Sequence, residues 1–278
     1  MRRVKAKQQI VARGGLTLIE LVLVLIIIAT LAGLIIPNIG MLGRTADMAA
    51  SASNQSNLAQ NIQLYFTLQK RFPLGMDSLL VSDGAAPSAV YLPQDLDSDG
   101  NQDIGLPDSG PHLDRSLFMG TLASSSGYDR SFTRSGFEYV FDHDTTIINS
   151  NDSAVFQRAL SGSIPVAEVY TNTGSESADQ LALARKLYPG TDGAVPSDVR
   201  LVALGIGPRH HMVPQTVLNA PIYPGCDGSY YGRYVAIFRV YASGERADLA
   251  GVVDSYGRAP DYTQQQFTES LPNNSRRG

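Results

Sequence analysis

One uninterrupted apolar run near the N-terminus constrains this chain more than any other feature. Residues 16–36 read LTLIELVLVLIIIATLAGLII, and Glu20 is the only charged residue in the run. As an α-helix with a rise of about 1.5 Å per residue, the run would be roughly 30 Å long, which matches the hydrocarbon core of a bilayer. The run therefore predicts a transmembrane helix over residues 16–37.

The charge distribution gives the expected orientation of that helix. Residues 1–15 contain five of the 22 basic residues and no acid, so the rest of the chain has 17 basic and all 26 acidic residues. Basic flanks stay on the cytoplasmic side of a membrane. We therefore expect a single-pass inner-membrane protein with a cytoplasmic N-terminus and its C-terminal bulk in the periplasm. The net charge of −4 argues against a nucleic-acid partner.

Three interpretations of the apolar run compete. A cleaved secretory signal has a shorter apolar stretch followed by a small-residue site, which residues 35–37 fit poorly. A plain membrane anchor fits the hydropathy but leaves Glu20 unexplained, because an ionised group inside a bilayer costs about 2.5 kcal/mol or more. In the simplest version of that interpretation, the Glu20 side chain reaches the lipid headgroups.

The third interpretation accounts for Glu20. The string GLTLIE at residues 15–20 resembles the class III leader junction of type IV pilins and type II secretion pseudopilins, with leucine where the family usually has phenylalanine. In that family a membrane-bound prepilin peptidase cuts after the glycine and methylates the new N-terminal amine. The resemblance implies cleavage between Gly15 and Leu16, N-methylation of Leu16, and removal of residues 1–15 as a basic leader.

The resemblance also implies how the processed chain assembles. In a filament of stacked apolar helices, the Glu20 carboxylate can neutralise the Leu16 ammonium group of a neighbouring subunit, because an unpaired charge there would be costly. Pro37 lies where the family has a helix-kinking proline, although it equally fits a simple membrane exit. We expect Glu20 and Pro37 to be assembly residues. The expected partners are prepilin peptidase, other pilin or pseudopilin subunits, the membrane and an inner-membrane assembly platform.

Residues 38–71 are expected to continue the helix with an amphipathic pattern. Apolar and small residues recur every three or four positions between Met41 and Phe66. Lys70 suits a helix C-terminus, and Pro73 ends the helix. Its weakly apolar first part is expected to pack against filament neighbours and its more apolar last part under a globular head. The alternative is that the whole stripe is an ordinary core-facing helix surface.

The remaining residues, 72–278, are expected to form a globular head. Alternating or β-branched runs predict strands at 137–141, 199–206 and 234–241, and residues 177–187 predict a helix. The predicted fold class is therefore α+β. A long N-terminal helix, transmembrane and then amphipathic, is expected to pack on an antiparallel β-sheet with long loops, as in pilins.

A candidate calcium site lies in an insertion, residues 82–135, that is rich in Ser, Asp, Gly and Pro. Acidic side chains at alternate positions followed by glycine resemble EF-hand calcium loops, in which several carboxylates converge on one hard cation. Leu106 stands where such loops have a bidentate glutamate, so a solvated turn is the competing interpretation. The expected ligands of a structural calcium ion are Asp95, Asp97, Asp99, Asn101 and Asp103.

Two features distinguish between the members of the family. The string DSYGRAPDY at residues 254–262 resembles the C-terminal signature of the major type II secretion pseudopilin, although Ser255 replaces a proline. With one cysteine, Cys226, the chain also lacks the disulfide that many type IV pilins contain. Both features favour a type II secretion pseudopilus that helps to export folded proteins. The alternative is a minor subunit of a type IV pilus for adhesion, motility or DNA uptake.

The sequence contains no motif that indicates an enzyme. His210 and His211 are adjacent and would point to opposite sides of a strand, so they are not expected to chelate a metal, and Cys226 has no evident base partner. We therefore expect no enzymatic activity. The rival from another class is a solitary membrane-anchored binding module that holds a ligand in a calcium-dependent way and forms no filament.

Overall fold

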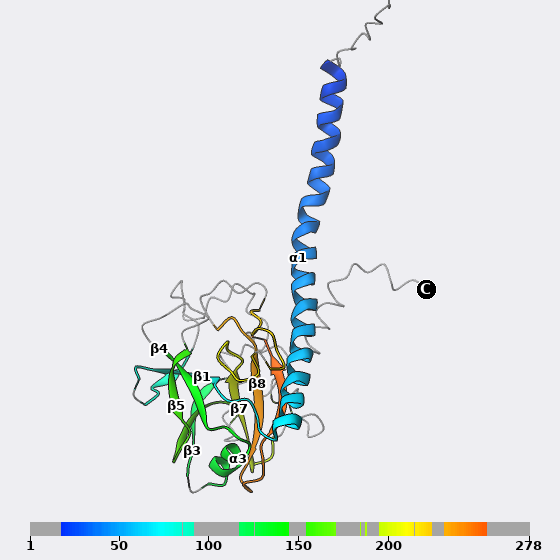
Figure 1. The fold of residues 1–278 in the computed structure, drawn as a ribbon. Coiled ribbons are helices and arrows are strands. Elements are labelled where there is room, and N and C mark those ends of the chain that lie inside the picture. The colour runs from blue at the N-terminus through cyan, green and yellow to red at the C-terminus, as the bar shows by residue number, and fades with distance from the viewer. Residues whose placement is uncertain are drawn as a thin grey trace, which may run out of the picture. The chain divides into compact units, whose positions relative to one another are not determined.

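The computed structural model of the chain (Figure 1) divides into two compact units, Met1–Thr45 and Ala46–Gly278. The structure describes residues 18–84, 86–91, 117–124, 126–144, 154–170, 184, 187, 195–213, 215–223 and 231–254.

Helix α1, Leu18–Gln69, begins in the first unit and ends in the second. It ends where the Lys70 backbone turns into the left-handed region, with φ of 58°. The Lys70 N–H still donates to the Phe66 carbonyl at 2.8 Å, and Pro73 follows, which has no N–H with which to continue the helix. The helix ends at Gln69, two residues before the predicted boundary at residue 71, so Lys70 and Arg71 follow its last turn.

The nine described strands form one curled sheet in the second unit. Their order is β3-β6-β7-β1-β4-β5, with β2 paired to β1 and with β8 between β7 and β9. The strands are β1 Met76–Ser82, β2 Ala89–Val90, β3 Phe118–Leu122, β4 Tyr139–Asp144, β5 Ala154–Ala159, β6 Ile164–Tyr170, β7 Val199–Gly205, β8 Val235–Tyr241 and β9 Asp248–Val253. A short helix, α3, Tyr128–Arg134, lies between β3 and β4 in the chain.

The sheet is mixed, because β1 pairs with β4 in parallel while the other described strand pairs are antiparallel. The predicted fold class, with its antiparallel sheet, is therefore wrong. Parallel neighbours need a crossover connection of a dozen or more residues. Residues 83–138 supply that connection, and they include β2, β3 and α3, which the sequence patterns did not indicate.

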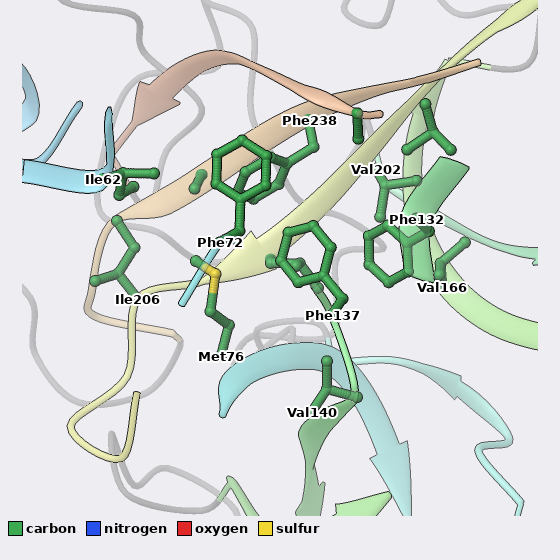
Figure 2. Packing of buried hydrophobic residues seen from close by; sticks show 14 of the residues in the cluster. Ile62, Phe72, Met76, Phe132, Phe137, Val140, Val166, Val202, Ile206 and Phe238 are labelled. Carbon is green, nitrogen blue, oxygen red and sulfur yellow. The ribbon is translucent and has the colours of Figure 1, made fainter. Parts of the chain in front are cut away.

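The core of the second unit lies between the last part of α1 and one face of the sheet (Figure 2). Ile62 is fully buried there, beside a group of aromatic rings. The rings of Phe72 and Phe137 stack with 5.5 Å between centroids, and Phe238 meets both of them edge-on. Among the described side chains of α1, burial begins only at Ser51. The expectation that the long helix packs on the sheet as a whole is therefore also wrong.

A second cluster of buried apolar residues contains the side chains of β7 that alternate with those of the first. Val202 and Leu204 belong to the cluster with α1, whereas Leu201 and Ala203 belong to the second. Because both faces are buried, β7 is apolar without interruption from Leu201 to Leu204. The strands predicted at 199–206 and 234–241 are confirmed as β7 and β8.

Two predicted elements match less closely or lie elsewhere. The strand predicted at 137–141 begins two residues later, as β4, and extends to Asp144. The helix predicted at 177–187 lies outside the described residues, except that Ala184 and Leu187 are helical and buried.

The structure also contradicts the membrane assignment. Within the described part of the chain, no helix is long and apolar enough to cross a membrane. From Asn38 onward, polar and charged residues such as Arg44 and Asp47 interrupt the apolar residues of α1. The predictions of a transmembrane helix over residues 16–37 and of a single-pass inner-membrane location with a periplasmic head are therefore corrected.

Candidate assembly site

The first part of α1 presents an unusual amount of apolar surface to solvent. Every described side chain from Leu18 to Thr30 is exposed, with Leu18 at 82% and Ile26 at 58%. We call residues 18–28 the apolar collar. Its large apolar side chains are Leu18, Ile19, Leu21, Val22, Leu23, Val24, Leu25, Ile26, Ile27 and Ile28.

The collar is apolar around its whole circumference. An α-helix has about 3.6 residues per turn, so the unbroken apolar run from Leu21 to Ile28 covers every direction around the axis. Burying one such side chain contributes about 1.5–3 kcal/mol, and a helix that is apolar on all sides is normally covered on all sides. A groove on one partner would cover only one face of the collar.

Glu20 is the only ionisable residue in the collar, and its side chain is exposed. It lies in the first turn of α1, where a carboxylate interacts favourably with the partial positive charge of the helix N-terminus. Gly15 and Leu16 lie outside the described residues, so the predicted cleavage site and the pairing of Glu20 with the Leu16 amine stay predictions. Pro37 lies inside α1, which continues past it.

Polar groups inside the second unit are paired with one another beside the 205–207 segment. Tyr231 donates a hydrogen bond to the Asp77 carboxylate at 2.9 Å. Gly207 allows this, because a Cβ there would collide with the Asp77 carboxylate, and a Cβ at Gly205 would collide with the Tyr231 hydroxyl. Burial, reinforced by the neighbouring Asp77 charge, raises the pKa of Tyr231 well above its ordinary value.

His143 completes this buried group. Its ring stacks on Tyr91 with 4.2 Å between centroids and meets Tyr231 edge-on at 5.5 Å. Burial lowers the pKa of His143 to about 3, so the imidazole is neutral at physiological pH. The ring therefore acts as a flat packing element rather than as a proton carrier.

A buried ion pair stabilises the irregular middle of β1. Arg158 binds both oxygens of Asp142, at 2.7 and 3.1 Å, and Ser78 donates to the same carboxylate. The pairing of β1 with β4 shifts register here, and Leu79 takes φ of 58°. Leucine in this left-handed conformation costs on the order of 1–2 kcal/mol, which the surrounding contacts must offset.

A third polar pair lies between β6 and β7. Arg200 donates to Glu168 at 3.1 Å and lies over the Tyr128 ring, 4.8 Å from its centre. Burial raises the pKa of Glu168 to about 7, although Arg200 works in the opposite direction. Gly120 leaves room for this carboxylate, since a Cβ at that position would overlap it.

The two adjacent histidines have separate environments. His211 shares a hydrogen bond of 2.8 Å with the Tyr139 hydroxyl. His210 is buried, and neither of its ring nitrogens has a hydrogen-bond partner among the described residues. Burial lowers the pKa of His210 to about 4. Within the described residues, no three His, Cys, Asp or Glu side chains are placed to hold a metal ion.

Several predicted site residues lie outside the described residues. They include the calcium loop with Asp95, Asp97, Asp99, Asn101 and Asp103, as well as Cys226. Of the string at 254–262, only Asp254 is described, and it is buried. The calcium site and the C-terminal resemblance therefore stay predictions.

Comparisons with known proteins identified no relative. No family model, no curated protein and no solved structure matches this chain.

Proposed function

We propose that this chain is a pilin-like structural subunit that polymerises through the apolar collar into a type II secretion pseudopilus. The processed chain would begin at Leu16, after prepilin peptidase has cut behind Gly15. The filament would help to export folded proteins, and other pilin-like subunits would be its neighbours.

The observation that carries this proposal is the exposure of the collar on every side of the helix. Ten large apolar side chains of the collar are exposed, and large exposed apolar patches mark interaction sites. A bundle of identical helices covers each of its members from several directions, which a single partner groove cannot do. Polymerisation therefore explains both the amount of apolar surface and its distribution around the axis.

Glu20 supports the same proposal by its position. It is the single charge of the collar and lies four residues after Leu16. In a dry helix bundle, a carboxylate lowers its desolvation cost by pairing with an ammonium group from a neighbour. The pairing would fix the axial register of an incoming subunit.

The first measurement is the mass of the N-terminal peptide of the protein isolated from its native cells. A peptide that begins with methylated Leu16 is the expected result. A peptide that still contains residues 1–15 would contradict processing, and the solitary binding module would become the better explanation.

The second test replaces the collar charge. Glu20→Ala is expected to stop filament formation while the second unit keeps its thermal stability. The matched control is Glu245→Ala, at an exposed glutamate in the second unit, which is expected to assemble normally. Normal filaments from the Glu20→Ala chain would overturn the assigned role of Glu20.

A further inference from the structure

The connection from β7 to β8 contains a buried imidazole without hydrogen-bond partners. We call residues 207–213, which follow the end of β7, the histidine turn. His210 lies in its middle and is 1% exposed, and neither of its ring nitrogens has a partner among the described residues. Buried polar groups in folded proteins are normally paired, so this side chain requires an explanation.

The charged groups around His210 are basic. Arg233 is 5% exposed, and its guanidinium group donates a hydrogen bond to the Ala220 carbonyl at 2.7 Å. Among the described residues, Arg233 and His211 are the groups whose charges act on His210, and both lower its pKa, in addition to the larger effect of burial. A protonated His210 would therefore be a second buried cation beside Arg233.

Arg233 is held in place more firmly than His210. It forms an antiparallel bridge with Ile222, and the next residue, Tyr234, is fully buried. The Tyr234 carbonyl accepts a hydrogen bond from the Ile206 N–H at 2.8 Å, and β8 follows directly, between β7 and β9. Repulsion between two buried cations is therefore relieved by movement of the histidine turn rather than of Arg233.

Few contacts hold the histidine turn against the rest of the second unit. Among the described residues, its backbone has one hydrogen bond to a distant part of the chain, from the His211 N–H to the Leu74 carbonyl at 2.9 Å. The Met212 side chain is fully buried in the core, and the His211 ring shares a hydrogen bond with the Tyr139 hydroxyl. Segments with few backbone hydrogen bonds open at a lower free energy than the strands of a sheet.

We propose that the histidine turn opens in acid, when protonation of His210 releases residues 207–213 from the core while the sheet stays folded. The step takes up one proton, which binds the imidazole once a ring nitrogen reaches water. Opening exposes the Met212 side chain and breaks the hydrogen bond to Leu74. This device belongs to the second unit alone and does not depend on the proposed function.

The proton balance gives the size of the effect. The pKa of His210 is about 4 in the closed turn, against an ordinary value of 6.5 for a solvated histidine. Between these two values, each step of one pH unit toward acid favours the open form about tenfold. Acidification from pH 7.5 to pH 5 is therefore expected to raise the population of the open form about 30-fold.

Amide hydrogen exchange of the full chain, read by mass spectrometry, tests this opening directly. The rate for the peptide that covers residues 207–213 is divided by the intrinsic rate of an unstructured chain at each pH. We expect its protection to fall about 30-fold from pH 7.5 to pH 5, while the peptide that covers β8 stays better protected at both pH values. Protection that does not depend on pH would overturn the proposal. Equal protection of the two peptides at pH 5 would also overturn it, because the whole second unit would then be unfolding.

Two uncharged variants identify the group that takes up the proton. In His210→Leu, the protection of residues 207–213 is expected to lose its dependence on pH. His210→Gln, which is also neutral at every pH, gives the same test with a polar side chain. A 30-fold loss of protection that persisted in both variants would show that another group controls the opening.

The matched control is the adjacent histidine. His211→Gln keeps a hydrogen-bonding side chain near Tyr139 and leaves His210 intact, so it is expected to retain the change of about 30-fold between pH 7.5 and pH 5. If His211→Gln abolished the pH dependence while His210→Leu preserved it, the proton would be assigned to His211 and the proposal would be wrong.

Discussion

The two ends of α1 use the same kinds of residue in opposite ways. Ile26 in the collar is 58% exposed, whereas Ile62 near the other end is fully buried under aromatic rings. Each lies in an unbroken stretch of the helix, so helix propensity does not separate them. The difference is the pattern around them, since the collar is apolar in every direction, whereas polar and small residues separate the apolar ones in the second part.

This difference shows where each part finds its stabilisation. The apolar stripe around Ile62 is buried within the chain, because the sheet covers that face of the helix. The collar has apolar side chains on faces that no single sheet could cover. In the proposed filament, several neighbouring subunits would cover these faces.

The largest expected effect comes from placing the same charge in both parts. Ile62→Asp puts an unpaired carboxylate into the core, and we expect a loss of more than about 4 kcal/mol in the free energy of unfolding. Ile26→Asp leaves the unfolding free energy of the second unit within about 0.5 kcal/mol, because the site is exposed. Urea denaturation followed by circular dichroism measures both.

The same two variants separate folding from assembly. Ile26→Asp is expected to stay folded and to form no filament, because the carboxylate would enter the dry helix bundle. If Ile26→Asp polymerised as the unsubstituted chain does, the collar would not be the assembly surface. If Ile62→Asp kept its full stability, the packing of α1 on the sheet would be wrong.

The second prediction concerns the stability of the second unit at low pH, to which the collar is expected to contribute nothing. Folding lowers the pKa of His143 and of His210 to about 3 and about 4. Between pH 6.5 and 4, the unfolded chain therefore binds protons that the folded chain does not. Above pH 6.5 these two histidines do not change the free energy of unfolding with pH. Below pH 6.5 the free energy of unfolding falls, by up to about 3 kcal/mol for each histidine at pH 4.

Replacing His210 isolates one of these contributions. His210→Leu removes a titrating group whose ring nitrogens have no hydrogen-bond partner among the described residues. The variant is expected to lose less stability than the parent chain between pH 6.5 and 4. An unchanged dependence of the unfolding free energy on pH would contradict the buried, neutral state of His210.

The third prediction concerns a contribution to stability that is lost as the pH rises, opposite to that of the two histidines. Burial raises the pKa of Glu168 to about 7 in the folded chain, from an ordinary value of 4.5. The folded chain then binds the extra proton, so the contribution is complete below pH 4.5 and is lost as the pH rises through 7. Glu168→Gln keeps the shape and an acceptor for Arg200, and is expected to be about 1–2 kcal/mol more stable than the parent chain at pH 8.

Thermal unfolding of the Glu168→Gln variant between pH 5 and 9 measures this effect. Its advantage over the parent chain should vanish by pH 5. An advantage that does not change with pH would mean that Glu168 is ionised throughout. The collar has only Glu20 as a titrating group, so Glu20→Ala is expected to leave these pH profiles of the second unit unchanged.

The predictions from the sequence were most accurate where the spacing of apolar residues alone determines the local structure. The end of α1 follows from Lys70 and Pro73, and β7 and β8 follow from apolar runs that are buried on both faces. The parallel pairing of β1 with β4 was missed because it depends on long-range contacts. The length of the connection at 83–138, which suits a crossover, was the one available signal.

The candidate sites divide in the same way. The apolar run predicted a transmembrane helix over residues 16–37, which the described part of the chain does not support. A groove between α1 and β9 could not be predicted, because it is lined by Phe66 from α1 and by Leu249 from a strand some 180 residues later. The pairing of Asp77 with Tyr231 depends on glycines at 205 and 207, whose importance appears only in three dimensions.

The smallest expected effect lies at the end of the packed part of α1. Lys70 holds φ of 58°, a conformation that costs a residue with a side chain about 1 kcal/mol and costs glycine almost nothing. Lys70→Gly is therefore expected to raise the free energy of unfolding by about 0.5 kcal/mol, after the greater freedom of glycine in the unfolded chain is subtracted. Gln69→Gly, one residue earlier and still helical, is expected to lower it by up to about 1 kcal/mol. Urea denaturation of the two variants should give changes of opposite sign, and equal losses would place the end of the helix elsewhere. Neither change touches the collar, so both chains should form filaments as the parent does, which keeps the stability of the packed part separate from assembly.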